Sequence, residues 1–286
     1  MLQNRATLRE VRSFLHREIR KVYSEGETSS MVPMILEYLG FPKTVYLTEP
    51  QLRPGHRTMA QIKEIVGEIH NRRPIQYILG YATFFDLSIS VDENVLIPRP
   101  ETEEMVHRII ERMREPPARI LDVGTGSGCI ALALKKAFPG ASVTGLELSG
   151  PALDLARMNG LRNGLEVEWI EGNLLDPAIQ DQLGGSELVV SNPPYVLPAE
   201  KKQMERNVLA YEPHRALFVE ENDPFRLYRA IADLAKRKLS SDGVLWLEIN
   251  ERFGSETAGY LHDAGFFRIS VIKDIHEKDR FIEARK

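Results

Sequence analysis

The stretch Ile120-Leu121-Asp122-Val123-Gly124-Thr125-Gly126-Ser127-Gly128 decides the fold of this chain. Its first four residues form a short, mostly apolar run of the kind that fills a buried parallel strand. Three glycines at every second position follow, and they allow a tight turn and a close approach of the backbone to a ligand. A helical pattern begins directly after the last glycine and runs over residues 129–138. A strand, a glycine-rich turn and a helix in this order predict the ligand-binding edge of an open α/β sheet.

The spacing of the glycines separates this turn from two other nucleotide-binding loops. It reads Gly-x-Gly-x-Gly rather than Gly-x-Gly-x-x-Gly, and it lacks the lysine of a phosphate-binding P-loop. Glu147 follows a second predicted strand, residues 142–146, about 20 residues after the loop, where an acid binds ribose hydroxyls in such folds. A carboxylate that only stabilises the N-terminus of the next helix is the alternative. We therefore expect a nucleoside ligand with Glu147 at its ribose.

From about residue 100 onward, predicted strands and helices alternate, which favours a doubly wound and mostly parallel sheet. Further apolar runs at 167–170, 187–190 and 244–249 extend this sheet. The chain ends with two apolar runs, 266–272 and 280–284, joined by a short polar link. Because no crossover helix fits into that link, we expect this last pair to be antiparallel.

The first 75 residues follow a helical pattern instead. Apolar residues recur at helical spacing over 8–22, 31–39 and 59–69, with a predicted break at 24–30 and a capping box at 58–61. Between residues 82 and 97 the period changes to two, which predicts a hairpin with strands at 85–91 and 95–97. We therefore expect a helical domain at 1–75, a β-hairpin linker at 76–100 and an α/β domain at 101–286.

Composition and charge narrow the class of protein. The 286 residues are 43% hydrophobic and 27% charged, which is typical of a globular protein. No window is long and apolar enough for a membrane span, and the first residues lack an apolar signal core, so we expect a cytoplasmic protein. The single cysteine, Cys129, excludes an internal disulfide and a cysteine-based zinc site.

The charge is unevenly spread along the chain. Residues 1–73 hold 12 basic and 8 acidic side chains, while the remainder holds 25 basic and 33 acidic ones. An acidic body argues against a dedicated nucleic-acid binder. The basic excess of residues 1–73 indicates a separate binding surface in this part of the chain. Solvent-exposed helix faces with no binding role have the same composition, and they are the alternative.

Asn192-Pro193-Pro194-Tyr195 directly follows one of the predicted strands. Because proline has no backbone N–H, two prolines cannot continue a strand, and the chain must leave the sheet at the edge where ligands bind. The asparagine side-chain oxygen and a free backbone carbonyl are both acceptors, so together they could hold an NH2 group by its two hydrogens. This pattern favours methylation of a planar amino or amide nitrogen, and a rigid surface turn is the alternative.

Asn173 and Leu174 follow the third strand of the α/β part. An asparagine acceptor there could meet an adenine amino group, and the leucine could pack on the adenine ring. Taken alone, Asn173 is more typical of a turn or a helix cap.

The glycine loop, Glu147 and residues 192–195 together resemble the S-adenosylmethionine-dependent class I amino-methyltransferases. Within this group the chain is similar to the PrmC/HemK family of release-factor glutamine methyltransferases. The stretches that carry the similarity are Arg73-Pro74-x-Gln76-Tyr77-Ile78-x-Gly80, Leu96-Ile97-Pro98-Arg99-Pro100-Glu101-Thr102-Glu103, Tyr211-Glu212-Pro213 and Asp279-Arg280. The similarity spans nearly the whole chain and is weakest before residue 58. The chain departs from the family pattern at Glu147 and Asn173, where the family has Asp, and at His214 and Val219-Glu220.

The resemblance implies an α/β fold of the class I methyltransferase (Rossmann-like) type. Its seven-stranded sheet would be mostly parallel with an antiparallel last strand, and a small all-helical N-terminal domain and a β-hairpin linker would precede it. The cofactor would be S-adenosylmethionine, with S-adenosylhomocysteine as product and no metal. The implied cofactor-binding residues are Gly124, Thr125, Gly126, Ser127, Gly128, Glu147, Asn173, Leu174 and Asn192.

The resemblance also implies the acceptor and its site. Asn192, Pro193, Pro194 and Tyr195 would be the catalytic and substrate-binding residues, and they would hold the glutamine of the Gly-Gly-Gln motif of class-1 peptide-chain release factors. The basic excess of the first 73 residues and their position ahead of the α/β domain predict that residues 1–75 recognise that partner, and we expect a monomer that acts without nucleic acid or membrane.

Three alternatives remain open. The first is a glutamine methyltransferase of a ribosomal protein, which shares the same core. The second is a nucleic-acid adenine or cytosine methyltransferase, which needs the same amino clamp together with base flipping, and the acidic body counts against it. The third is a non-catalytic cofactor-binding protein, and the intact stretch 192–195 counts against it.

Overall fold

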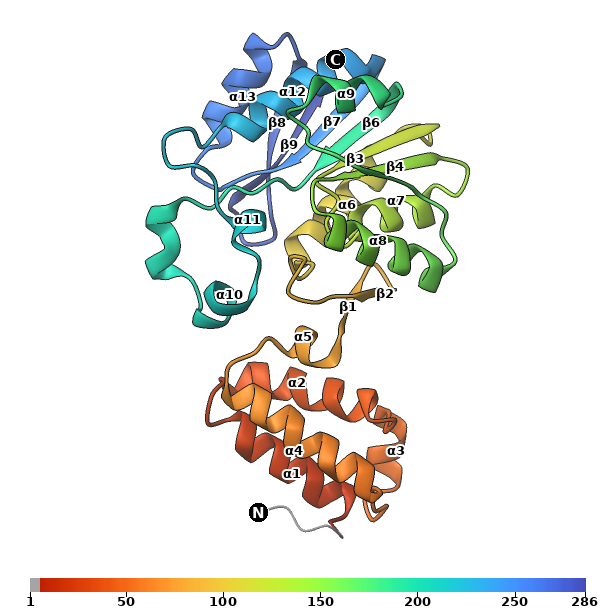
Figure 1. Ribbon diagram of the computed structural model, residues 1–286, viewed down its shortest axis with the longest axis vertical. Coiled ribbons are helices and arrows are strands. Elements are labelled where there is room, and N and C mark those ends of the chain that lie inside the picture. The colour runs from red at the N-terminus through yellow and green to blue at the C-terminus, as the bar shows by residue number, and fades with distance from the viewer. Residues whose placement is uncertain (1–5) are drawn as a thin grey trace. The chain divides into compact units, whose positions relative to one another are not determined.

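The computed structural model describes residues 6–286, which form two compact units (Figure 1). The first unit comprises the described residues up to Gly80 together with Glu205–Tyr211. The second comprises Tyr81–Met204 and Glu212–Lys286. A short segment that lies far along the sequence therefore belongs to the N-terminal unit.

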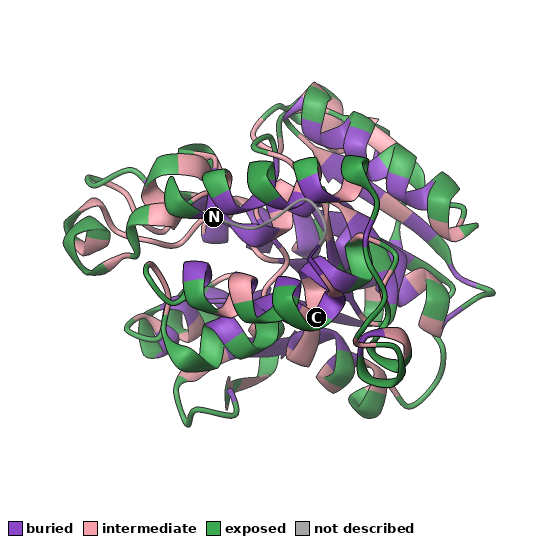
Figure 2. Cartoon of the chain, turned by 90° about the horizontal axis from the view of Figure 1, so that it is seen from below, coloured by how far each residue is buried: buried purple, intermediate pink, exposed green. Residues whose placement is uncertain are grey.

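The first unit is all-helical. Its elements are α1 (Leu8–Ile19), α2 (Glu25–Tyr38), α3 (Lys43–Thr48), α4 (His56–His70), α5 (Ile75–Leu79) and α10 (Arg206–Tyr211). Each long helix turns an apolar face inward, and Leu15, Ile35 and Ile62 are fully buried there. Figure 2 shows the resulting pattern, with buried and exposed residues on opposite sides of the helices. Burial of these faces, rather than intrinsic helix propensity, stabilises helices of this length.

The predicted break at 24–30 is wrong. Ser24 caps α2 instead, because its side chain accepts a hydrogen bond from the Glu27 N–H and the Glu27 carboxylate accepts one from the Ser24 N–H. This capping box begins the helix at Glu25, before its apolar stripe starts. The capping box predicted at 58–61 is also wrong, since α4 begins at His56 with Gly55 as its N-cap.

The hairpin lies earlier in the chain than predicted. Its strands are β1 (Tyr81–Phe84) and β2 (Leu87–Ser90), which pair antiparallel, and residues 95–97 form no strand. The turn is Phe85-Asp86, and both residues adopt left-handed backbone angles, with φ of +51° and +54°. Such a two-residue turn matches the twist of the flanking strands, but it normally carries asparagine or glycine. The apolar alternation that predicted a single strand at 85–91 therefore covers both the turn and the second strand.

One buried amide fixes the hairpin to the rest of the second unit. Asn159 in α8 (Gly150–Asn163) accepts a hydrogen bond from the Ser90 N–H at 2.7 Å. Its Nδ2 donates to the Ser90 carbonyl at 3.1 Å and to the Ser127 carbonyl at 2.9 Å. The same side chain thus ties the hairpin to the glycine loop.

The second unit contains a seven-stranded sheet with the order β5-β4-β3-β6-β7-β9-β8. Its strands are β3 (Arg119–Val123), β4 (Ser142–Glu147), β5 (Glu168–Glu171), β6 (Ser186–Ser191), β7 (Leu239–Glu248), β8 (Phe267–Lys273) and β9 (Asp279–Arg285). β3 to β7 are parallel, whereas β9 is antiparallel to both of its neighbours. This sheet confirms the predicted class I methyltransferase topology. The strand order reverses between β3 and β6, and ligands bind at such a point in open α/β sheets.

Helices cover both faces of the sheet. Those of the second unit are α6 (Pro100–Arg112), α7 (Cys129–Ala137), α8, α9 (Pro177–Gln182), the 3₁₀ helix η1 (Pro198–Gln203), α11 (His214–Leu217), α12 (Arg226–Lys238) and α13 (Gly254–Asp263). α12 and α13 share an apolar cluster with Leu121, Val123 and other strand residues. Asp122 lies between Leu121 and Val123 in β3, so its side chain points to the opposite face of the sheet. There it accepts a hydrogen bond from the Ala131 N–H, and α7 therefore covers that face. Among the helices of residues 6–286, none is both long enough and apolar enough to span a membrane.

Candidate active site

A pocket lies at the carboxyl ends of β3, β4 and β6, beside the reversal of strand order. Its lining includes most of the residues expected at the cofactor and substrate: Gly124, Thr125, Gly126, Ser127, Glu147, Asn173, Leu174, Asn192, Pro193 and Pro194. The other two expected residues, Gly128 and Tyr195, are not in this lining. The structure thus brings together residues from four separate parts of the sequence.

The three glycines of the loop share a left-handed backbone conformation but differ in what surrounds them. All three have left-handed φ values of 73°, 56° and 81° at Gly124, Gly126 and Gly128. A Cβ on Gly124 or Gly126 would meet no atom within 4 Å, whereas one on Gly128 would lie 2.8 Å from the Trp169 ring. Gly128 is therefore needed for packing beneath the loop, and Gly124 and Gly126 leave the space above it open.

Glu147 is held rigidly at the end of β4. Its Oε2 accepts a hydrogen bond from the Gly126 N–H and its Oε1 accepts one from the Ser149 N–H, each at 2.9 Å. Each carboxylate oxygen keeps a second acceptor position. Two fixed acceptors that line the pocket fit a pair of neighbouring ribose hydroxyls.

Asp122 supports the loop from below. It is fully buried, and its Oδ2 accepts hydrogen bonds from the Thr125 hydroxyl at 2.5 Å and the Ala131 N–H at 3.2 Å. In the described part of the chain, its Oδ1 has no partner. Burial raises the pKa of Asp122 to about 7.

Asn173 and Leu174 both line the pocket, as expected for residues near an adenine. The Asn173 Oδ1 accepts a hydrogen bond from the Leu175 N–H at 2.9 Å, which is the geometry of an Asx turn. Leu174 packs against the apolar cluster of α12 and α13. Asn173 thus has the turn role that its residue type favours and also faces the pocket.

The stretch 192–195 leaves β6 as its sequence predicts. The Ser191 hydroxyl donates to the Val123 carbonyl at 2.6 Å and joins the ends of β6 and β3. The Asn192 Nδ2 donates to the Thr102 hydroxyl at 3.0 Å. Within residues 6–286, no hydrogen bond reaches the Asn192 Oδ1 or the Pro193 carbonyl. Two acceptors at the pocket wall are therefore available to a ligand.

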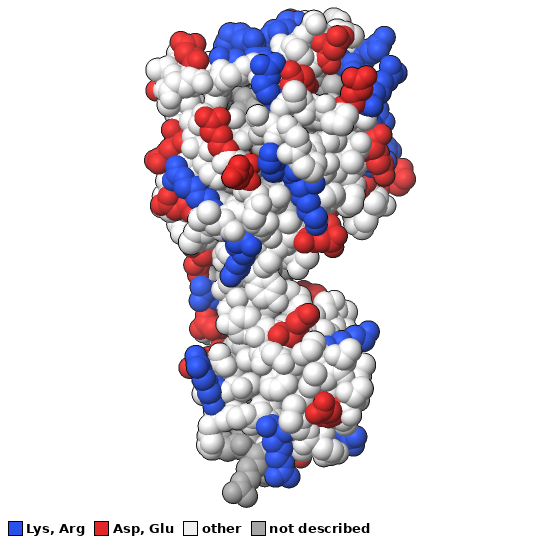
Figure 3. Space-filling model, turned by 90° about the vertical axis from the view of Figure 1, so that its right-hand side faces the viewer, with Lys and Arg blue, Asp and Glu red and all other residues white. Residues whose placement is uncertain are grey.

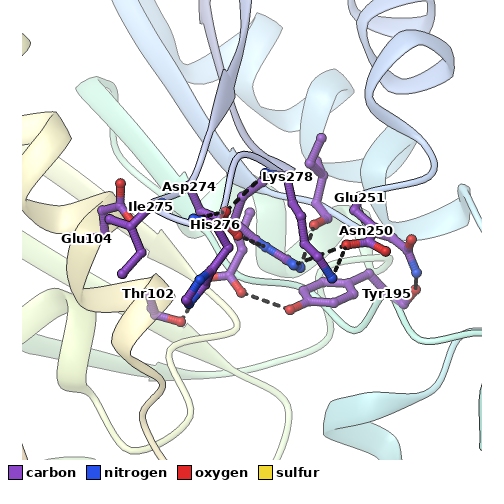
Figure 4. A network of polar contacts seen from close by, with 12 residues as sticks. Thr102, Glu104, Tyr195, Asn250, Glu251, Asp274, Ile275, His276 and Lys278 are labelled. Carbon is purple, nitrogen blue, oxygen red and sulfur yellow. Dashed lines mark hydrogen bonds and ion pairs between the residues drawn. The ribbon is translucent and has the colours of Figure 1, made fainter. Parts of the chain in front are cut away.

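Behind this stretch lies a buried carboxylate that the sequence did not reveal as part of the site. Glu248, at the end of β7, is 1% exposed and accepts hydrogen bonds from the hydroxyls of Thr102 at 2.7 Å and Tyr195 at 2.9 Å. Figure 4 shows Thr102 and Tyr195 within this network. Burial raises the pKa of Glu248. A lone acid inside the otherwise apolar run 244–249 was the signal that could have identified it.

Two stretches of the family resemblance meet next to the pocket. The buried Glu212 accepts hydrogen bonds from the Ile97 N–H at 3.2 Å and from the Arg99 guanidinium. The neighbouring Arg215 also lines the pocket, where its guanidinium donates to the Ser149 hydroxyl. Sequence reasoning missed Arg215, which lies in the segment that departs from the family pattern.

Residues 217–219 form part of the scaffold near the site. Val196 pairs with Phe218 in a parallel bridge, through hydrogen bonds of 2.9 Å to the Leu217 carbonyl and 3.0 Å from the Val219 N–H. His214 stacks edge-on against Phe218, with ring centroids 5.3 Å apart. This bridge anchors the chain directly after Tyr195. Across residues 6–286, no group of three or more His, Cys, Asp or Glu side chains could hold a metal.

Comparison with known proteins assigns the family. A methyltransferase small domain model matches residues 106–219. A protein of Flavobacterium psychrophilum named release factor glutamine methyltransferase is 42% identical over 270 residues, which are 93% of this chain and 94% of the relative. The chain belongs to the release factor glutamine methyltransferase family. A family member from Bacteroides thetaiotaomicron is 35% identical and is covered over 99% of its length, with 96% of this chain. This family is one of S-adenosylmethionine-dependent methyltransferases, so the resemblance stated from the sequence is confirmed.

A solved structure supports the fold alone. A methyltransferase from Pyrococcus furiosus matches with a TM-score of 0.53 at 17% identity, over 80% of this chain and 98% of that protein. This structural similarity covers more of the chain than residues 106–219, which the family model matches.

Proposed function

We propose that this chain transfers a methyl group from S-adenosylmethionine to the side-chain amide nitrogen of a glutamine in a peptide-chain release factor. The acceptor is the glutamine of the Gly-Gly-Gln motif of class-1 release factors, and the reaction takes place in the cytoplasm. The name shared by the full-length relatives supports the substrate. The single observation that carries the chemistry is the pair of open acceptors, Asn192 Oδ1 and the Pro193 carbonyl, in the same pocket as Glu147.

The residues present fit the cofactor. Gly124 and Gly126 leave open space above the loop, and Glu147 offers two fixed acceptors to a ribose. Asn173 and Leu174 line the region assigned to the adenine. The bound cofactor supplies an electrophilic sulfonium methyl, and this chemistry requires no metal ion.

Asn192 and Pro193 orient the acceptor. A glutamine amide nitrogen is a weak nucleophile because its lone pair is delocalised into the carbonyl. When Asn192 Oδ1 and the Pro193 carbonyl accept its two N–H groups, the nitrogen is aimed at the methyl and the positive charge that develops on it is stabilised. The bound cofactor would supply the methyl group and leave as the neutral thioether with the electron pair of the broken sulfur–carbon bond, and the amide nitrogen would lose one proton. Tyr195 was expected to pack on the amide plane, but it is not among the residues that line the pocket, and its hydroxyl donates to Glu248 instead.

The first unit selects the protein partner. Residues 1–73 carry a basic excess, while the second unit holds all of the pocket lining. Helix α10 belongs to the first unit although it follows the stretch 192–195 in the sequence. We therefore assign partner recognition to the first unit, including α10.

The function is tested by mass spectrometry of a release factor after incubation with the enzyme and cofactor. A mass increase of one methyl group on the Gly-Gly-Gln glutamine is the expected result. Methylation of ribosomal proteins or DNA in parallel reactions, with none on the release factor, would contradict the proposal.

On the face drawn in Figure 3 acidic and basic side chains are interspersed, unlike the basic stripe of a nucleic-acid binder.

A further inference from the structure

We propose that Thr102 and Glu248 are positioning residues that fix which way the Asn192 amide points. They hold its nitrogen away from the pocket, so that its oxygen is presented to the acceptor nitrogen. This inference rests on the proposed function, in which the Asn192 oxygen accepts a hydrogen bond from the substrate amide.

The Asn192 amide needs such a restraint. An asparagine amide carries an acceptor oxygen and a donor NH2 group of nearly the same shape, and rotation by about 180° exchanges them. In the reversed orientation the Asn192 NH2 would face the NH2 of the substrate. Two sets of donors would then oppose each other, and the acceptor nitrogen would be neither held nor stabilised.

A chain of three side chains removes this freedom. The Thr102 hydroxyl donates its single proton to Glu248 Oε2 at 2.7 Å, and the Tyr195 hydroxyl donates to Oε1, so both oxygens of this carboxyl group act as acceptors. The Thr102 oxygen can then only accept on its other side. The Asn192 group beside it, at 3.0 Å, must therefore be the donor Nδ2, and Oδ1 is left on the opposite side of the amide.

The carboxylate is placed so that it can impose this order. Thr102 and Glu248 are only 2% and 1% exposed, so water does not offer either group another partner. Burial raises the pKa of Glu248, while the Thr102 and Tyr195 hydroxyls and the charge of Arg280 oppose that rise. Arg280 itself is held by an ion pair with Asp274 at 3.2 Å.

The same carboxylate also fixes the side chain of Tyr195. Its second oxygen, Oε1, accepts the Tyr195 hydroxyl at 2.9 Å, so each oxygen of Glu248 receives one side-chain donor. The three elements that meet here are the first turn of α6, the end of β7 and the turn after β6. This arrangement gives Thr102, within the stretch 96–103, a specific task in the reaction.

The test compares Thr102→Val, which keeps the shape but removes the hydroxyl, with Thr102→Ser, which keeps the hydroxyl. Single-turnover rates at saturating cofactor and release factor, KM for the release factor and cofactor affinity are measured for each. Thr102→Val is expected to lower the rate about 10- to 100-fold through misorientation of the amide. Thr102→Ser should remain within a few-fold of the parent, and cofactor affinity should change little in either variant.

A double-mutant cycle identifies the route of the effect. If Thr102 acts through Asn192, adding Thr102→Val to Asn192→Ala should cause no further loss of rate. The inference would be overturned if the rate of the double variant fell by the product of the two single losses. It would also be overturned if Thr102→Val had a normal rate while Asn192→Ala alone was slow. A normal rate in Asn192→Ala would instead overturn the proposed function as well. Thermal unfolding and cofactor binding report folding, and Glu248→Gln replaces Thr102→Val in the cycle if the valine variant does not fold.

Discussion

The Glu147 carboxylate accepts a hydrogen bond from the Gly126 N–H at 2.9 Å, and this contact joins the end of β4 to the glycine loop after β3. Its other oxygen accepts from the Ser149 N–H at the start of α8. The acid that is proposed to bind the ribose therefore also fixes the shape of the loop that lines the same pocket. Cofactor binding and loop order should change together when this side chain is removed.

Glu147→Ala is expected to weaken cofactor binding by about 1–3 kcal/mol, because two acceptors for the ribose diol are lost. Isothermal titration calorimetry with S-adenosylhomocysteine measures the change. Glu147→Asp keeps the carboxylate and serves as the matched control, with an affinity within a few-fold of the parent. Equal affinity in the alanine variant would remove the ribose assignment.

Gly128→Ala should destabilise the protein. Its left-handed backbone alone costs about 1–2 kcal/mol for a residue with a side chain, and the new Cβ would also lie 2.8 Å from the Trp169 ring. Gly140 is the control, since a Cβ there meets nothing within 4 Å and no left-handed φ is required. Urea unfolding should place Gly140→Ala within about 0.5 kcal/mol of the parent. Equal midpoints for both variants would show that Trp169 does not restrict the loop.

Asp122 predicts a specific pH dependence of stability. Its pKa rises from the ordinary 3.8 to about 7 on folding, so the folded state binds more protons between these values and stability falls as pH rises through that window. Asp122→Asn cannot ionise. The difference in unfolding free energy between variant and parent should therefore grow in favour of the variant from about pH 4 to 7, by on the order of 4 kcal/mol, and then level off. Parallel curves across this range would mean that Asp122 is not held in its neutral form.

Removal of the residues up to Gly80, which leaves α10 in the chain, tests the role of the other helices of the first unit in partner recognition. A chain that begins at Tyr81 keeps the whole pocket lining and should still bind cofactor. Its kcat/KM on a folded release factor should fall about 10-fold or more, equivalent to at least about 1.4 kcal/mol of lost binding. A short Gly-Gly-Gln peptide should be methylated by both forms at similar rates. Full activity of the truncated form on the folded factor would exclude a recognition role.

Much of the architecture could be predicted because its signals are local in the sequence. The apolar run before Gly124, the acid after the second strand and the two prolines at 193–194 each report a strand end, and the carboxyl ends of parallel strands lie on one edge. The short polar link before β9 likewise excluded a crossover helix.

Most of the failures come from features that depend on tertiary context, whereas the Ser24–Glu27 capping box of α2 is a local signal that apolar periodicity does not contain. Phe85 and Asp86 form a left-handed turn without the usual asparagine or glycine, because the pairing of β1 and β2 imposes it. Ser24 caps α2 before its apolar stripe begins, so the periodicity alone placed the helix start too late. The link between Glu248 and Asn192 passes through Thr102, and these three residues are far apart in the sequence and adjacent only after folding.

The central claim is that the Asn192 side-chain oxygen holds the acceptor amide during methyl transfer. The most direct measurement is the single-turnover rate of methyl transfer to a release factor by a folded Asn192→Ala variant at saturating cofactor. The rate is expected to fall about 100-fold or more, because an aligned polar group is lost from the transition state. The fold should survive, because Pro193 and Pro194 still set the turn. A rate within a few-fold of the parent, in a variant with normal cofactor affinity and unfolding temperature, would contradict this role of Asn192.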